Sequence, residues 1–94
     1  MKEFTKKEID KVVGKIVQEF RISKGLTQEQ LADELNITQK YISRVENGSS
    51  GLGHATLLSY IDHLGITPNA LYSELLTNEN IKRQLEISKE INKL

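Results

Sequence analysis

The sequence contains no cysteine, no tryptophan and only one proline, and neither sign of charge dominates it. Without cysteine the chain can form neither a disulfide framework nor a thiolate metal site. No run of apolar residues approaches the length that crosses a bilayer. The charged N-terminus is not followed by the apolar stretch of a secretory signal, so we expect a cytoplasmic location. The length of 94 residues predicts one domain with a modest core.

The residue patterns that carry chemistry in enzymes are also missing. His54 and His63 are far apart in sequence and have no acidic or thiol partner at the spacing of metal ligands. No glycine-rich phosphate loop follows a strand, and no paired carboxylates stand in a frame typical of acid–base catalysis. We therefore expect no enzymatic activity, no metal and no cofactor, and we expect no small-molecule substrate because short helices leave little room for a pocket.

The net charge is zero, with 13 Lys and Arg against 13 Asp and Glu, which argues weakly against a nucleic-acid partner. The charges are unevenly distributed, however. Residues 1–26 hold seven Lys or Arg and four Asp or Glu, whereas residues 27–53 hold two and four. If the chain binds nucleic acid, we expect modest non-specific affinity and a strong dependence on dimerisation and base contacts.

The first helix is predicted over residues 5–24, where an apolar stripe recurs at helical spacing. Thr5 and Glu8 match a capping box at its start, and Gly14 within it can mark a close contact with another helix. Four lysines lie off the stripe and form either a solvated face or a set of phosphate contacts. The stripe is Ile9, Val12, Val13, Ile16, Val17 and Phe20, and the lysines are Lys6, Lys7, Lys11 and Lys15.

Two short helices joined by a tight turn are predicted between Gln28 and Asn47. Thr27 and Gln30 match a capping box for the first helix, and Asn36 suits the left-handed conformation that ends it. Thr38 can cap the second helix. Helices joined by so short a turn cross steeply and pack closely. The inward apolar residues are Leu31, Ala32, Leu35, Ile37, Ile42 and Val45.

The outward face of the second short helix, residues 39–47, is polar and carries no acidic residue. Such a row of donors and acceptors can recognise base edges in a major groove, which is wide enough to admit a helix. Tyr41 points between this face and the core, so contact with DNA and packing both remain open. The outward residues are Gln39, Lys40, Ser43 and Arg44.

Three further helices are predicted after a glycine-rich loop at residues 49–53. The first ends at Gly65, and the second opens at Thr67-Pro68, a cap followed by proline where its missing N–H does no harm. The third, residues 78–94, has two apolar strips, so it either packs on its own domain and on a partner or is a charged tail. The expected inward residues are Leu57, Leu58, Ile61 and Leu64, then Ala70, Leu71, Leu75 and Leu76; the strips are Ile81 and Leu85, and Ile87, Ile91 and Leu94.

Five short motifs agree with a known family in type and spacing: Gly25-Leu26-Thr27-Gln28, Leu31-Ala32, Ile37-Thr38, Ile42-Ser43 and Glu46-Asn47-Gly48. Over about residues 17–76 the chain resembles the Xre/Cro/phage-repressor-like helix-turn-helix family. The departure is Asn36, where the family usually has glycine. The resemblance implies an all-α, five-helix repressor-like DNA-binding domain at residues 1–77, with the helix-turn-helix at residues 28–47. Beyond that domain we expect residues 78–94 to form an additional C-terminal helix that serves oligomerisation or packing.

The resemblance also implies roles for single residues. An ion pair between Arg21 and Glu46 ties the first helix to the third. Tyr60 and Tyr72 are candidates for a two-fold interface. Base edges are assigned to Gln39, Lys40 and Arg44, with Thr38 and Ser43 secondary, and phosphates to Gln28, Asn47 and Lys40, with Gln28 also bracing the start of the recognition helix.

The implied function is a sequence-specific transcriptional regulator, a repressor that binds double-stranded DNA as a homodimer at a pseudo-palindromic operator. A phage, restriction–modification, antitoxin or housekeeping context remains open. The alternative is a protein–protein interaction module that keeps this fold, or an antitoxin-type autorepressor with a partner protein. Zero net charge favours the alternative, and the acid-free outward face of residues 39–47 favours DNA.

Overall fold

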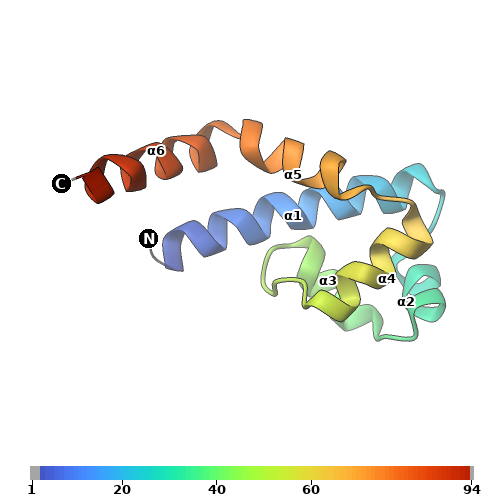
Figure 1. Cartoon of the computed structure of the whole chain (residues 1–94). Coiled ribbons are helices and arrows are strands. Elements are labelled where there is room, and N and C mark those ends of the chain that lie inside the picture. The colour runs from blue at the N-terminus through green and yellow to red at the C-terminus, as the bar shows by residue number, and fades with distance from the viewer. Residues whose placement is uncertain (1–2, 94) are drawn as a thin grey trace.

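The computed structural model describes the backbone of residues 3–93 and the side chains of residues 6–83 and 85–87. Within this range the chain forms six helices and no strand, which confirms the all-α fold (Figure 1). No helix among the described residues combines the length and the apolar character that a membrane span requires. The helices are α1 (Glu3–Ser23), α2 (Gln28–Leu35), α3 (Gln39–Glu46), α4 (His54–Leu64), α5 (Pro68–Thr77) and α6 (Glu79–Lys93).

Local capping chemistry fixes the ends of α2 and α3. The Thr27 hydroxyl accepts the N–H of Gln30 at 3.0 Å, and the Gln30 side chain accepts the N–H of Thr27 at 2.9 Å, which completes the predicted capping box. Asn36 ends α2 in the left-handed conformation, with φ 56° and ψ 44°. Thr38 then caps α3 by accepting the N–H of Tyr41 at 3.1 Å.

The absence of a side chain at Gly14 lets α1 and α3 touch through their backbones. A Cβ added at this residue would overlap the carbonyl oxygen of Val45 and lie 2.9 Å from that of Glu46. The close helix contact predicted at Gly14 is therefore present, and the C-terminal end of α3 rests directly on α1.

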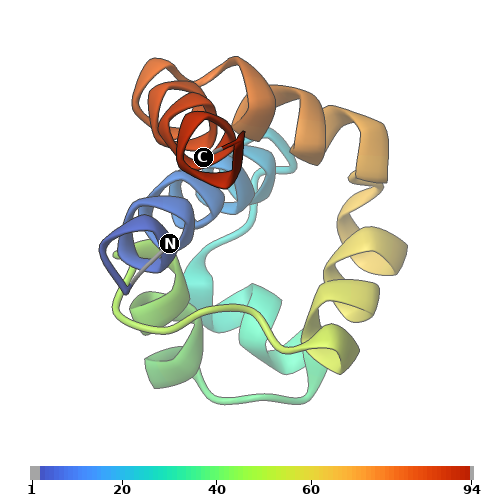
Figure 2. The ribbon, with the colours of Figure 1, turned by 60° about the vertical axis from the view of Figure 1, so that its left-hand side comes forward.

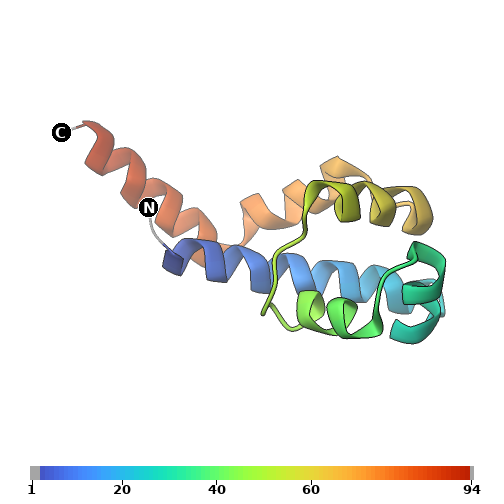
Figure 3. The same ribbon diagram turned by 90° about the horizontal axis from the view of Figure 1, so that it is seen from below.

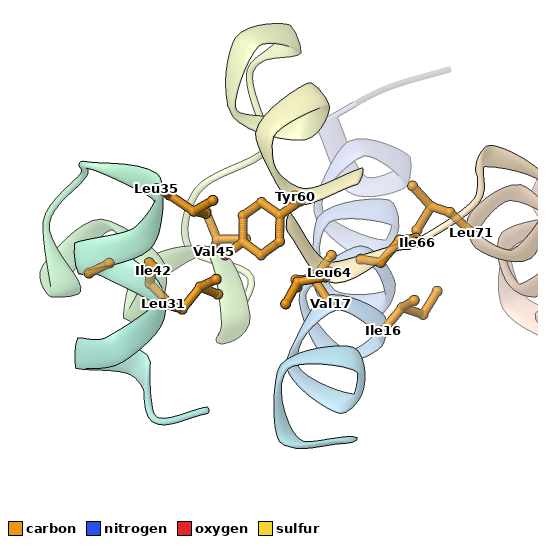
Figure 4. Packing of buried hydrophobic residues seen from close by; sticks show 11 residues of the cluster. Ile16, Val17, Leu31, Leu35, Ile42, Val45, Tyr60, Leu64, Ile66 and Leu71 are labelled. Carbon is orange, nitrogen blue, oxygen red and sulfur yellow. The ribbon is translucent and has the colours of Figure 1, made fainter. Parts of the chain in front are cut away.

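A single apolar core lies between α1 and the layer formed by α2, α3 and α4. The ring of Tyr60 sits in the middle of this cluster, with Val45 against it and Val17 of α1 nearby (Figure 4). The fully buried residues come from all four helices and from the segment that follows α4. They are Val17, Leu31, Ile42, Val45, Tyr60, Leu64 and Ile66.

Helix α6 continues the chain beyond the domain implied by the resemblance and packs on α1 and α5. The Asn78 side chain caps it by accepting the N–H groups of Asn80 and Ile81 at 3.1 and 3.2 Å. Helices α6 and α3 lie on opposite flanks of α1 (Figure 2). From its contact with α1 onward, α6 diverges from it, and the molecule is elongated, with extents of 49 × 22 × 20 Å (Figure 3).

Several expectations about orientation are wrong. Helix α1 begins at Glu3, so Thr5 lies inside the helix and is not its N-cap. Leu58 and Leu76 were expected inside but are 66% and 60% exposed, because each lies on the solvent side of its helix. Tyr60 is buried in the core and offers no surface for an interface, whereas Tyr72 is exposed. The side chains of Ile91 and Leu94 lie outside the described residues.

Candidate nucleic-acid interface

Helix α3 presents one polar face to solvent and one apolar face to the core. Gln39, Lys40 and Arg44 are exposed, while Ser43 is half-buried at the edge of the outward face. Ile42 and Val45 point inward and are buried. Thr38 stands at the exposed start of the helix, where its hydroxyl oxygen is occupied by the cap. The structure thus brings together the five residues assigned to base contacts on a single surface.

A buried ion pair fixes this surface to the rest of the fold. The Nε and Nη2 atoms of Arg21 donate to the two carboxylate oxygens of Glu46 at 2.6 and 3.0 Å. The Arg21 and Glu46 side chains are only 10% and 2% exposed. Arg21 Nη1 also donates to the Leu26 carbonyl oxygen at 2.7 Å, so the guanidinium joins α1, the α1–α2 turn and α3. Two parallel bonds to one carboxylate hold both partners in a fixed geometry.

The buried charge of Arg21 is compensated by Glu46. Hydrogen bonding to Glu46 raises the pKa of Arg21, and this effect outweighs desolvation, which acts in the opposite direction. The carboxylate of Glu46, the one acid of α3, is correspondingly compensated inside the protein. It therefore does not add negative potential to the outward face of the helix.

Gln28 is tied to the same carboxylate. Its Nε2 atom donates to Glu46 Oε1 at 3.0 Å, and the side chain is half-buried. Gln28 therefore braces the C-terminal end of α3 through Glu46, a contact that the resemblance did not specify. Gln28 and Gln39 nevertheless line one shallow depression between the start of α2 and the start of α3.

The loop after α3 is held by the helix itself. The N–H groups of Ser49 and Ser50 donate to the Arg44 carbonyl oxygen at 2.9 and 3.1 Å, and Gly48 adopts a φ of 82° that allows this turn. The Asn47 side-chain oxygen accepts the N–H of Ser49 at 2.9 Å. Asn47 is an exposed residue, and its amide nitrogen takes part in no hydrogen bond recorded among the described side chains.

Tyr41 contributes to the same loop. It is half-buried, packs against the core and donates its hydroxyl to the Gly51 carbonyl oxygen at 3.3 Å. Of the two roles that the sequence left open for Tyr41, packing is the one for which the structure gives contacts. The sequence does not indicate this bond, because it joins residues ten positions apart through the irregular loop.

The outward face of α3 carries two positive charges, Lys40 and Arg44, beside uncharged polar side chains. Lys40 and Arg44 are exposed, and neither takes part in the ion pairs recorded among the described side chains. Its hydrogen-bond donors are the planar guanidinium of Arg44, the ammonium group of Lys40 and the amide of Gln39. Such groups can form bidentate hydrogen bonds to guanine and adenine.

Comparison with known proteins identifies this arrangement. A family model described as helix-turn-helix matches residues 17–71, which is more than half of the chain. The chain belongs to the helix-turn-helix family, of the Xre/Cro/phage-repressor type. The matched segment of this helix-turn-helix protein contains Arg21, Glu46 and the whole of α3, and it leaves out residues 3–16 of α1 and all of α6.

A solved structure shares the fold of this helix-turn-helix protein. The clp gene regulator ClgR from Corynebacterium glutamicum matches with a TM-score of 0.69 and 22% sequence identity over 88% of each chain. No curated protein sequence matches the chain. Family membership makes the protein a DNA-binding transcriptional regulator, whose partner is double-stranded DNA.

Proposed function

We propose that the protein is a dimeric repressor that places α3 in the major groove of a pseudo-palindromic operator. The observation that carries the proposal is the acid-free outward face of α3, fixed to the fold by the buried pair of Arg21 and Glu46. A helix can discriminate bases only if its side chains arrive in a defined register. The buried pair supplies that register, because it joins α3 to the helix behind it.

Within this proposal, three residues contact base edges. Arg44 and Lys40 have the donors to pair with guanine, and Gln39 can form two hydrogen bonds with adenine. Thr38 and Ser43 lie beside them at the edge of the same face. Each good bidentate pair discriminates against the wrong base by about 1–3 kcal/mol, so a few such pairs suffice for a specific site.

Phosphate contacts position the helix without selecting bases. Gln28 is the first residue of α2, where the backbone N–H groups that the Thr27 cap leaves unpaired favour anions. The amide nitrogen of Asn47 can hold a phosphate at the C-terminal end of α3, and the flexible charge of Lys40 can hold one along the groove. The bond from Gln28 to Glu46 uses one of the two amide hydrogens of Gln28 and leaves the second for a phosphate oxygen.

Dimerisation is proposed because one α3 covers only half of a typical operator. Two copies related by a two-fold axis present two recognition helices about 34 Å apart, which is one turn of DNA. Exposed apolar side chains on α5 and α6 support an interface on that side of the molecule. They are Tyr72, Leu76, Leu85 and Ile87.

Selection of bound sites from a random pool of double-stranded DNA tests the proposal. A dimeric repressor should enrich a pseudo-palindrome whose half-sites are centred about one helical turn apart. Enrichment of an asymmetric site of a few base pairs would contradict dimeric reading, and no enrichment above the starting pool would contradict sequence-specific binding. Placement of the selected site over a promoter in a reporter assay then separates repression from activation.

The second candidate is a protein–protein interaction module that keeps this fold without binding DNA, or an antitoxin-type autorepressor that binds a protein partner as well as DNA. The zero net charge favours it, and Leu58 on α4 and Leu76 on α5 offer exposed apolar side chains that a protein partner can cover. A mobility-shift assay with random DNA at low and moderate salt distinguishes the interaction module from the two DNA-binding candidates, the dimeric repressor and the autorepressor. A module that has lost DNA binding gives no shift at either salt concentration.

A further inference from the structure

The helix-turn-helix segment of this protein has too few cations of its own for a surface that approaches DNA. Residues 27–53 contain Lys40 and Arg44 against four acids. Glu46 is compensated by Arg21, but the remaining three acids, all on α2, are exposed. DNA affinity depends mainly on neutralised phosphates. Any further cation that strengthens DNA binding has to come from another part of the chain that lies beside α3.

The N-terminal half of α1 is the part that meets this requirement. A Cβ added at Gly48 would lie 2.7 Å from Lys11 Cγ and 3.0 Å from Lys11 Cα, so the loop that ends α3 rests on α1 at Lys11. A Cβ at Gly51 would likewise lie 3.0 Å from a carboxylate oxygen of Asp10. Lys11 is thus fixed next to Asn47 and Gly48, at the C-terminal end of the proposed recognition helix.

The charges on this part of α1 are not equivalent. Lys6 is paired with Asp10 at 2.8 Å, so these two charges compensate each other. Lys7 and Lys11 are both exposed, and neither belongs to the ion pairs recorded among the described side chains. They are four residues apart, which puts them on one face of the helix about one turn from each other. Both lie outside the segment that the family model matches.

We propose that Lys7 and Lys11 contact the phosphates of the DNA strand that passes the C-terminal end of α3. The two lysines extend the DNA-binding surface from Asn47 along α1, beyond the family segment, and supply positive charge that residues 27–53 lack. This inference rests on the proposed function. Because the contacts are to phosphate, they strengthen binding to every sequence and do not change which sequence is preferred.

Lys15 provides a matched comparison within the same helix. It is also an exposed lysine, but it lines a hollow with Glu74 and Thr77, on the flank of α1 that faces α5 and the start of α6. Helix α3 lies on the other flank (Figure 2). The substitutions Lys11→Gln and Lys15→Gln remove the same charge from the same helix and leave the helix propensity nearly unchanged. Lys11→Gln removes the charge beside the loop that ends α3, whereas Lys15→Gln removes it on the flank that faces α5 and the start of α6.

Salt dependence of DNA affinity is the measurement. Each phosphate contact adds about 0.9 to the slope of log affinity against log salt, so Lys11→Gln should reduce the slope of a dimer by about 1.8. Over about a fourfold rise in salt, this variant should lose roughly tenfold less affinity than the wild type. Lys7→Gln/Lys11→Gln should reduce the slope about twice as much, equally for the selected operator and for random DNA. Lys15→Gln should keep a slope close to that of the wild type.

The outcomes separate this inference from the function on which it rests. Wild-type protein that binds neither operator nor random DNA contradicts the proposed function itself. Wild-type binding with equal slopes for Lys11→Gln and Lys15→Gln overturns only the role of the α1 lysines. A loss confined to the operator overturns it as well, because phosphate contacts weaken all sequences alike. Circular dichroism of each variant establishes that α1 remains folded.

Discussion

The helix pair α2–α3 and the helix pair α5–α6 use their apolar residues differently. In α2 and α3 the large aliphatic side chains are buried, and the polar residues lie outside. On α5 and α6, by contrast, four large apolar side chains are between 38% and 60% exposed: Tyr72, Leu76, Leu85 and Ile87. The first pair is complete within one chain, whereas the second leaves apolar surface in water. We infer that α2–α3 binds a polar partner such as DNA, and that α5–α6 binds an apolar protein surface.

Loss of Glu46 should have the largest effect, because it removes the connection that makes α2–α3 rigid. Glu46→Ala leaves the Arg21 charge buried without a partner, and we expect the free energy of unfolding to fall by about 3–5 kcal/mol. The double variant Arg21→Ala/Glu46→Ala should cost less than the sum of the single variants, since neither charge is then stranded. Thermal denaturation of the four proteins measures the coupling. Strictly additive losses would show that the two residues do not stabilise α3 as a pair.

Gly14→Ala tests the backbone contact beneath the same helix. The added methyl group would overlap the Val45 carbonyl oxygen, so α1 and α3 must move apart, and we expect a loss of about 1–3 kcal/mol in unfolding free energy. Alanine is otherwise the better helix former, by about 1 kcal/mol at an unconstrained position. Gly53→Ala is a control without a steric clash, because a Cβ there meets nothing within 4 Å, and it should lose only the N-cap preference for glycine over alanine at the start of α4. An increase in the unfolding free energy of Gly14→Ala, measured by urea denaturation, would show that the backbones of α1 and α3 do not approach each other this closely.

Arg44→Ala addresses the outer face of α3 and should separate binding from folding. The side chain is exposed, so its removal should change the unfolding free energy by less than about 0.5 kcal/mol. Binding to the operator should weaken by about 1–3 kcal/mol, with relaxed preference at one base position, if Arg44 contacts a base edge. Titrations with the operator and with its single-base variants measure both quantities. An equal loss on every sequence would assign Arg44 to phosphate.

Much of α2 and α3 could be predicted from the sequence because their ends depend on neighbouring residues. The caps at Thr27, Asn36 and Thr38 each involve groups within four positions, and all three are present. The bond between Gln28 and Glu46 could not be predicted in this way, since it joins residues eighteen positions apart through the tertiary fold. The pairing of Glu46 with Arg21 was predicted from the family resemblance and not from a local sequence pattern.

The sequence did not predict correctly which face of α4 is buried. Leu57 and Leu58 are adjacent, so a helix cannot bury both equally, and periodicity does not say which of them faces the core. Tyr60 and Leu64 are both buried in the core. The helix is rotated so that these residues face inward, and Leu58 therefore lies in solvent. A tyrosine is an uncommon choice for full burial, because its hydroxyl then needs a partner, and none is recorded for it among the described residues. Burial accordingly raises the pKa of Tyr60.

The smallest effect on folding is expected at Ile87, where the comparison between the two helix pairs is sharpest. Ile87 is 49% exposed, whereas Ile81 on the same helix is 3% exposed and packs within its own chain. Ile81→Ala should therefore cost about 2–5 kcal/mol of unfolding free energy, while Ile87→Ala should change the stability of the monomer by less than about 0.5 kcal/mol. If α6 belongs to the dimer interface, Ile87→Ala should nevertheless raise the dimer dissociation constant. Sedimentation equilibrium over a range of concentrations measures it, and an unchanged constant would place the interface away from this side of α6.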